Sequence, residues 1–281
     1  MATLSLTDRT ILVTRSVGQS SEFTQSLIHA GAKVIEMPTL EIVAPSSWES
    51  LDNAIMNLAK FNWLILTSSN AVNFFFDRLN AHGQDVSELG EVKIAVVGEK
   101  TAQTLKQKDL QPDFTPPNFV ADSIVEKFPE EFSGKKILFP RVESGGRDFL
   151  VREFTAKGAE VVEAAAYQSV CPSNIPPEAK LALKKFNVDV ITFASSKTVR
   201  FFCQLLAKTF NVKWSGDSKT EEENLRRVVK KYLQGVCVAS IGPQTSKSCF
   251  SLIGRVDLEA KEYTLDGLIK ALVEWNCFLN K

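Results

Sequence analysis

The stretch Ile11-Leu-Val-Thr-Arg15 decides the fold, because it returns later in the chain as Ile137-Leu-Phe-Pro-Arg141. Leu66-Thr-Ser-Ser-Asn-Ala-Val72 likewise returns as Phe193-Ala-Ser-Ser-Lys-Thr-Val199 at almost the same spacing. Three further pairs follow in the same order, namely 31–36 with 158–163, 97–101 with 241–245, and 121–125 with 265–269. The last two pairs are spaced more widely, so a single insertion separates the copies. We expect two similar lobes whose similar loops face each other across a cleft.

Each copy alternates short β-branched runs with amphipathic helical stretches, a pattern that predicts a parallel sheet covered by helices. Strands are predicted at Thr10–Thr14, Trp63–Leu66, Lys93–Val97, Lys136–Phe139, Asp189–Phe193 and Gly235–Ile241. We therefore predict an α/β protein with two five-stranded, flavodoxin-like parallel sheets.

Helices are predicted at 20–30 and 147–157. In the first helix the spacing places Phe23, Leu27 and Ile28 on one face, which we expect to be the buried face. Gly31 and Gly158 follow the two helices and suit the left-handed conformation that ends a helix.

Two longer segments, Val34–Val43 and Val161–Val170, interrupt this pattern. Both are too long and too extended for one interior strand, and Pro38 would remove a hydrogen bond from the middle of a sheet. We interpret them as a pair of extended stretches that cross between the lobes.

The insertion falls near Trp214–Val229. Its run Asp217–Glu223 is polar and charged, and Leu225, Val228 and Val229 then form a weak helical stripe. The sequence favours a solvated surface excursion here.

The composition is that of an ordinary globular protein. The chain has 281 residues, enough for about two domains, and its formal net charge is zero. A balanced charge argues against nucleic acid as a partner but allows a small anionic ligand in a local basic cleft. No apolar stretch reaches the roughly 18 residues of a membrane span, and no leader segment is apparent before the first strand. We expect no membrane association.

The cysteines indicate the compartment. They are five in number, all in the second half, and none forms a C-x-x-C pair. We interpret them as reduced core thiols in a cytosolic compartment rather than as disulfides or a zinc site.

Polar residues follow four of the predicted strands, and ligands of open α/β sheets bind at such strand ends. The loops are Thr14–Ser16, Thr67–Asn70, Arg141–Arg147 and Ala194–Lys197. Serines that precede helices are equally good N-caps, and arginines can form ordinary surface ion pairs, so both roles stay open. The candidate substrate-binding residues in these loops are Arg15, Ser68, Ser69, Arg141, Ser144, Gly145, Arg147, Ser195, Ser196 and Lys197.

Two further turns suit an anion. Gly98-Glu-Lys-Thr101 and Gly242-Pro-Gln-Thr245 place a glycine after a strand and a threonine where a helix begins, which makes Lys100, Thr101 and Thr245 candidates. A purely structural turn is as good an explanation. No nucleotide-binding glycine motif is present, so a nucleotide-dependent transferase is disfavoured.

The usual catalytic groups are scarce. Neither histidine lies near a plausible nucleophile, and no group of residues has metal-ligand spacing, so we expect no metal. Tyr167 remains as a proton donor, because a phenol is protonated at neutral pH and its alanine neighbours leave room for a ligand. A tyrosine on a strand is also a common packing residue.

Taken together, these residues resemble the uroporphyrinogen-III synthases of tetrapyrrole biosynthesis. The resemblance rests on an ordered set that spans nearly the whole chain: ILVTR at 11–15, LTSSNAV at 66–72, VVGEKTA at 96–102, RVESGGRDFL at 141–150, AYQSV at 166–170, FASSKTV at 193–199, IGPQT at 241–245 and TLDGLIKAL at 264–272. The insertion at 214–229 lies outside this pattern.

The resemblance implies two α/β lobes joined by a two-stranded ladder, with the first strand and helix of each repeat exchanged between lobes. One lobe would be 1–37 plus 172–281, and the other 38–171. It implies a monomeric, cofactor-free lyase of haem and chlorophyll biosynthesis that converts the linear tetrapyrrole hydroxymethylbilane to uroporphyrinogen III. The route runs through loss of the hydroxyl, an azafulvene and a spiro-pyrrolenine that inverts the last ring. We expect a cytoplasmic location, with a plastid left open.

The resemblance also implies roles for single residues. Tyr167 matches the family's candidate acid, and Thr101, Ser68, Ser195 and Thr245 match positions that face the cleft. The alternative function is a non-catalytic, two-lobed protein that binds a tetrapyrrole or a small anion.

Overall fold

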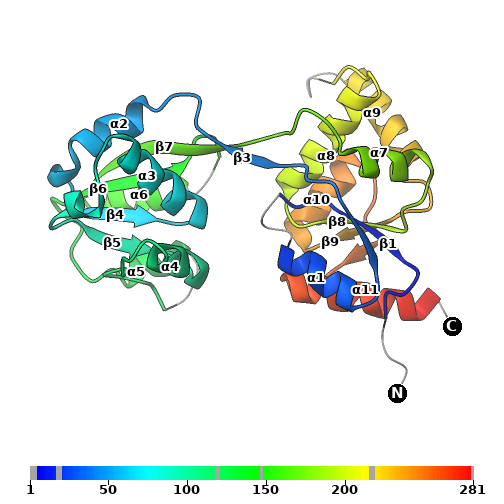
Figure 1. The fold of residues 1–281 in the computed structure, drawn as a ribbon, viewed down its shortest axis with the longest axis horizontal. Helices are drawn as coiled ribbons and strands as arrows, with labels where there is room; N and C mark the ends of the chain where they lie inside the picture. The colour runs from blue at the N-terminus through cyan, green and yellow to red at the C-terminus, as the bar shows by residue number, and fades with distance from the viewer. Residues whose placement is uncertain (1–4, 17–20, 118–120, 146–147, 215–218, 280–281) are drawn as a thin grey trace. The chain divides into compact units, whose positions relative to one another are not determined.

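The computed structural model describes residues 5–16, 21–117, 121–145, 148–214 and 219–279 (Figure 1). The chain divides into two compact units. We call Met1–Glu41 with Val170–Lys281 the split unit and Ile42–Ser169 the continuous unit. Each contains one five-stranded sheet with helices on both faces. This confirms the prediction of an α/β protein with parallel sheets.

The sheet of the split unit has the order β2-β1-β8-β9-β10, with all four neighbouring pairs parallel. Strands of the first sequence copy thus pair with strands of the second. The bounds are β1 Thr10–Val13, β2 Lys33–Glu36, β8 Val190–Phe193, β9 Cys237–Ser240 and β10 Leu258–Glu259. The middle strands β1, β8 and β9 are fully buried, because apolar and small side chains meet helices on both faces.

Two helical layers cover this sheet. One face packs against α1 (Ser21–His29) and α11 (Leu265–Leu279). The other face packs against α7 (Pro177–Lys184), α8 (Ser196–Thr209), α9 (Lys219–Tyr232) and α10 (Pro243–Leu252).

The sheet of the continuous unit has the order β3-β7-β6-β4-β5. The bounds are β3 Glu41–Val43, β4 Trp63–Leu66, β5 Lys93–Val96, β6 Lys136–Val142 and β7 Glu160–Val170. One face packs against α2 (Glu49–Met56), α3 (Ser69–Ala81) and α4 (Glu99–Lys106), and the other against α5 (Ala121–Glu126) and α6 (Asp148–Ala156). Short 3-10 turns lie at Leu58–Lys60 and Val86–Leu89.

The two longer segments of the sequence carry the boundaries between the units, which fall after Glu41 and after Ser169. The first segment contains β2 and β3, separated by a short extended stretch around Pro38. The second is the single eleven-residue strand β7, which pairs with β6 over most of its length and also neighbours β3.

The prediction for the first helix is correct except at Ile28. Phe23 and Leu27 are buried, whereas 46% of Ile28 is exposed. Residues 23 and 27 lie one turn apart, but residue 28 lies a further 100° or so around the helix. Gly31 and Gly158 have φ angles of 93° and 91°, which confirms them as left-handed helix stops.

The prediction of a solvated excursion at the insertion is wrong. Most of it forms α9, in which Leu225 and Val229 are 1% and 0% exposed and join the core under α8. Trp214 packs against the same core. Of the charged residues described in this helix, Glu223 is exposed, whereas Glu221 and Glu222 are partly buried, as expected of an amphipathic helix that packs on a core.

Among the described residues, every helix is too short or too polar to cross a bilayer.

Candidate functional site

Both sheets place candidate residues at the carboxyl ends of strands, and in each sheet two of them lie beside the point where the strand order reverses. In the split unit this point lies between β1 and β8, next to Arg15 and Ser195. In the continuous unit it lies between β6 and β4, next to Arg141 and Ser68. Flavodoxin-like sheets bind their ligands at this switch point.

Ser68 and Tyr167 meet in the continuous unit. Ser68 is the N-cap of α3, and its Oγ accepts a hydrogen bond from the backbone N–H of Ala71 at 3.1 Å. The same Oγ lies 3.1 Å from the hydroxyl oxygen of Tyr167. The Tyr167 ring stacks on Phe74 with 5.8 Å between centroids, and only 9% of the residue is exposed. The pair therefore places a phenol proton beside a helix N-terminus.

A β-bulge aims Tyr167 at this position. Arg141 of β6 pairs with Ala165 of β7, whereas the next residue, Val142, pairs with Tyr167, so Ala166 is the extra residue. Side chains alternate along a regular strand, and Ala166 and Tyr167 would then face opposite sides of the sheet. Because of the bulge both lie in the core cluster under α2 and α3.

The ends of β4 and β5 are joined by hydroxyl groups. Ser69 Oγ donates to the carbonyl of Lys100 at 3.4 Å. The Thr104 hydroxyl lies 2.8 Å from both the Ser69 hydroxyl and that carbonyl. The Lys100 side chain is exposed at this edge. Sequence reasoning missed Thr104, although its spacing of one helical turn after Lys100 could have indicated it.

Arg141 lies on the opposite face of the same sheet from Tyr167. Its guanidinium forms an ion pair with Glu163 and donates to the Gly145 carbonyl at 3.4 Å. It also lies 5.8 Å from the ring centroid of Phe139, which belongs to the core under α5 and α6. The structure thus joins Arg141 with Gly145 but not with Tyr167.

This part of the sheet edge is hollowed. The hollow has a volume of about 260 Å³ and is lined by Arg141, Val142, Glu143, Gly145, Glu163 and Ala165. Ser144 is exposed beside it, and Gly145 has a φ of 69°, which favours glycine. Arg147 lies outside the described residues.

In the split unit Arg15 follows a rigid strand end. The Thr14 hydroxyl donates to the Thr192 carbonyl at 2.7 Å, and Thr39 N–H donates to the Thr14 carbonyl at 3.2 Å. Arg15 is half-buried, and this burial lowers the pKa of its guanidinium. A guanidinium that has lost part of its hydration gains more from a carboxylate partner than an exposed one does.

The loop after β8 repeats the geometry of the loop after β4. Ser195 is the N-cap of α8 and accepts from Thr198 N–H at 3.2 Å. Ser196 Oγ donates to the Gln244 carbonyl at 2.9 Å, as Ser69 does to Lys100. Lys197 is partly exposed in the first turn of α8. The cap role that the sequence left open is therefore present in both units.

Thr101 and Thr245 are both buried, each with 4% exposed. The Thr101 hydroxyl donates to the Val97 carbonyl at 3.0 Å. This bond uses the one proton of the hydroxyl. The Thr101 oxygen can still accept a hydrogen bond, but it cannot donate one to a substrate carboxylate. The turn before α4 needs its glycine, because Gly98 has a φ of 96°, in the left-handed region that favours glycine.

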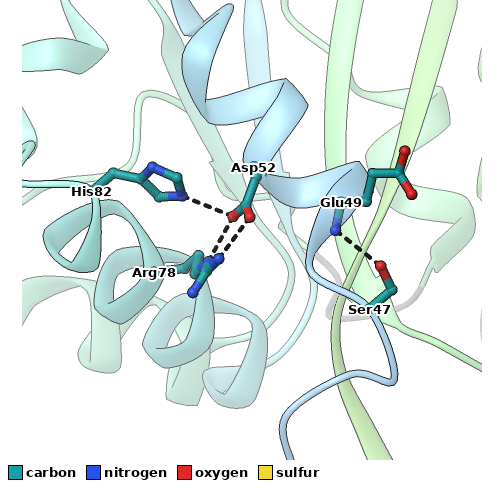
Figure 2. Close-up of polar contacts among 5 residues, drawn as sticks. All are labelled: Ser47, Glu49, Asp52, Arg78 and His82. Carbon is teal, nitrogen blue, oxygen red and sulfur yellow. Dashed lines mark hydrogen bonds and ion pairs between the residues drawn. The ribbon is translucent and has the colours of Figure 1, made fainter.

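A charged cluster that sequence reasoning did not identify joins α2 to α3 (Figure 2). Asp52 accepts two hydrogen bonds from Arg78, each 2.6 Å, and lies 2.8 Å from Nε2 of His82. The Arg78 guanidinium also lies 4.7 Å from the ring centroid of Trp48. The hydrogen bonds from Arg78 lower the pKa of Asp52 to about 2. This cluster ties α2 to α3, the helices that cover the same face of the sheet as Tyr167.

We expect Asp52→Asn to weaken the pH dependence of stability in acid. The folded-state pKa of about 2 lies below the ordinary value of 3.8, so Asp52 stabilises the fold above about pH 4 and loses this contribution as the pH falls toward 2. Glu130, whose pKa is held at about 2 by Lys135 and Lys93, still contributes to the pH dependence of stability in the variant. Urea unfolding between pH 2 and 6 should give a shallower acid limb for the variant.

Asp77→Asn is the matched control for this experiment. Asp77 lies on α3 and is largely exposed, with an ion pair to Lys108. If both variants flatten the acid limb equally, the Asp52 cluster contributes no more to acid-dependent stability than an exposed ion pair does.

The structure offers no cluster of three or more metal-ligating side chains among its described residues. The cysteines are free thiols, three of them buried and two partly exposed. Burial raises the pKa of Cys237 and of Cys249 to about 12. They behave as core residues rather than as nucleophiles or metal ligands.

Known proteins match this chain over nearly its whole length. A family model described as uroporphyrinogen-III synthase HemD matches residues 21–270. The uroporphyrinogen-III synthase of Synechococcus elongatus is 50% identical over 275 residues, which are 98% of both chains. Among solved structures, the enzyme from Helicobacter pylori superimposes with a TM-score of 0.60 at 17% identity, covering 95% of this chain and 99% of that one. A mutant enzyme from Thermus thermophilus gives a TM-score of 0.57 at 16% identity, covering 97% and 100%.

Proposed function

The chain belongs to the uroporphyrinogen-III synthase family, and we infer from this that it closes hydroxymethylbilane to uroporphyrinogen III with inversion of the last pyrrole ring. The observation that carries the inference is the 50% identity to the Synechococcus synthase over 98% of both chains. The product equals the substrate minus water, so the reaction needs proton transfer and positioning but no net oxidation or reduction. This makes the chain a lyase.

The first step needs an acid, and Tyr167 is our choice. The carbon–oxygen bond of the substrate hydroxymethyl group breaks with its electron pair on oxygen, and that oxygen takes the Tyr167 proton and leaves as water. The ring then closes, and a proton lost from the substrate returns to the phenolate. Support comes from the placement of the Tyr167 hydroxyl beside Ser68 at a strand end.

Binding of the octa-anionic substrate calls for cations and donors spread over a wide area. Arg15 and Lys197 lie at the strand ends of the split unit, and Lys100 and Arg141 lie at those of the continuous unit. We assign them to the substrate carboxylates. Ser196 and Ser69 are assigned to ordering the loops, because their hydroxyls donate to neighbouring carbonyls.

One assay tests the function. Hydroxymethylbilane closes without enzyme to the non-inverted isomer I, so purified protein is added to it and the two uroporphyrin isomers are separated after oxidation. We expect isomer III to dominate. An isomer ratio equal to that of the enzyme-free control would instead indicate a tetrapyrrole-binding protein without catalysis.

Arg15→Ala should raise KM by about 10- to 100-fold and lower kcat much less. A half-buried guanidinium bound to a substrate carboxylate contributes equally in the ground state and the transition state, and one charge-assisted hydrogen bond is worth roughly this factor. Arg141→Ala should act in the same direction, and at this position the substrate must compete with Glu163 for the guanidinium. Steady-state kinetics at constant ionic strength measure both effects.

Arg227→Ala is the control for the loss of one positive charge. Arg227 is exposed on α9 and lies on the side of Gly235, before the amino end of β9, away from the carboxyl ends of the strands. A similar rise in KM for this variant would mean that overall charge, rather than Arg15, determines substrate affinity.

A further inference from the structure

Ser68 and Ser195 are equivalent helix caps in the two copies, but their hydroxyl groups have different side-chain partners. Ser68 and Ser195 occupy the same place in the repeated motif, and each accepts a hydrogen bond from the backbone N–H three residues later. In the split unit that third residue is Thr198, whose hydroxyl lies 3.4 Å from the Ser195 hydroxyl. In the continuous unit it is Ala71, which has no hydroxyl. The local partner of the serine proton is therefore missing only in the continuous unit.

A distant residue takes that place. Tyr167 lies 99 residues from Ser68 in sequence, and its hydroxyl oxygen is 3.1 Å from Ser68 Oγ. The residue at the corresponding place in the first copy is Leu40, which cannot form a hydrogen bond through its side chain. Both units therefore have the serine cap. The continuous unit has Ala71 and Tyr167 around it, where the split unit has Thr198 and Leu40.

Either hydroxyl can be the donor in this pair, because Ser68 Oγ keeps its own proton and one lone pair after accepting the Ala71 N–H. Ser68 Oγ already accepts the Ala71 N–H, and the Tyr167 hydroxyl is its hydrogen-bond partner within the described part of the chain. If Ser68 donates to Tyr167, the phenol proton is left for an incoming group. A phenol is also much the stronger acid of the two hydroxyls, so the charged form of the pair is the phenolate with Ser68 donating to it.

We propose that Ser68 is a positioning residue that donates a hydrogen bond to Tyr167 and couples the phenol to the N-terminus of α3. This rests on the proposed function, in which Tyr167 protonates the departing hydroxyl. As the Tyr167 O–H bond breaks, negative charge develops on its oxygen, and the Ser68 O–H and the positive end of the α3 dipole stabilise it. The proton goes to the leaving oxygen, which departs as water, and the phenolate recovers a proton from the substrate on ring closure.

The test removes the Ser68 hydroxyl while keeping the helix cap. Ser68→Gly does this, because glycine is nearly as good an N-cap as serine, and Ser68→Thr keeps both cap and hydroxyl. We expect kcat to fall about 10- to 100-fold in Ser68→Gly, the effect of losing one hydrogen bond to a developing charge, and to stay near wild type in Ser68→Thr. Urea unfolding midpoints of the variants confirm that they are folded.

A double mutant separates this role from a direct contact with substrate. If Ser68 acts only through the phenol, Ser68→Gly should cause no further loss of kcat in a Tyr167→Phe background. An equal fractional loss in both backgrounds would overturn the inference, and so would a Ser68→Thr variant as slow as Ser68→Gly. The isomer III yield of the wild-type protein tests the proposed function separately, so the two failures are distinguishable.

Discussion

Tyr167→Phe is expected to lower kcat by about 10²- to 10⁴-fold, the usual contribution of one general acid. The phenol is the group that we assign to protonation of the departing hydroxyl, and phenylalanine removes only its oxygen. Stacking on Phe74 and burial under α3 are retained, so the fold should survive with the loss of about 0.5–1.5 kcal/mol for the hydrogen bond to Ser68. Single-turnover kinetics with hydroxymethylbilane measure the chemical step.

Tyr232→Phe is the control for removal of a phenol oxygen. Tyr232 lies at the end of α9, where its ring stacks on Phe210 at 4.0 Å between centroids. It lies near the amino ends of β8 and β9, away from the carboxyl ends of the strands, so the kcat of this variant should equal that of wild type. A Tyr167→Phe enzyme with full kcat would remove Tyr167 from the mechanism.

Leu225→Ala is expected to lower the free energy of unfolding by about 2–5 kcal/mol, the range for truncating a buried leucine. Leu225 is 1% exposed and lies in the core that α9 shares with α8. Truncation loses buried apolar area and leaves a cavity that the packed neighbours cannot fully close. Urea unfolding at neutral pH, followed by circular dichroism, measures the change.

Lys230→Ala on the exposed side of α9 is the matched control and should change stability by no more than about 0.5 kcal/mol. If Leu225→Ala were as mild as Lys230→Ala, the insertion would be peripheral to the fold after all.

Local chemistry made much of this protein predictable. The strand Trp63–Leu66 was predicted with its observed bounds, because a short apolar run between polar segments is typical of a buried parallel strand. The caps at Ser68 and Ser195 follow from hydroxyls placed three residues before the N–H groups they bind. Each of these features depends on residues close together in the sequence.

The errors share a different cause. Ile28 and the insertion were misjudged because apolar residues of similar spacing can face either solvent or core, and only the position of a neighbouring element decides which. For α9 that element is α8, and no local pattern indicates that the two helices share a core.

The sequence by itself determined the duplicated α/β plan, the strand ends that carry polar side chains, and the family. Tertiary structure alone decided that Tyr167 turns toward Ser68 while Arg141 faces the other side of the same sheet. The reason is the bulge at Ala166, since one extra residue in β7 reverses which face the next side chain occupies. A period-two pattern read along one strand cannot contain that information, because a bulge exists only relative to the partner strand.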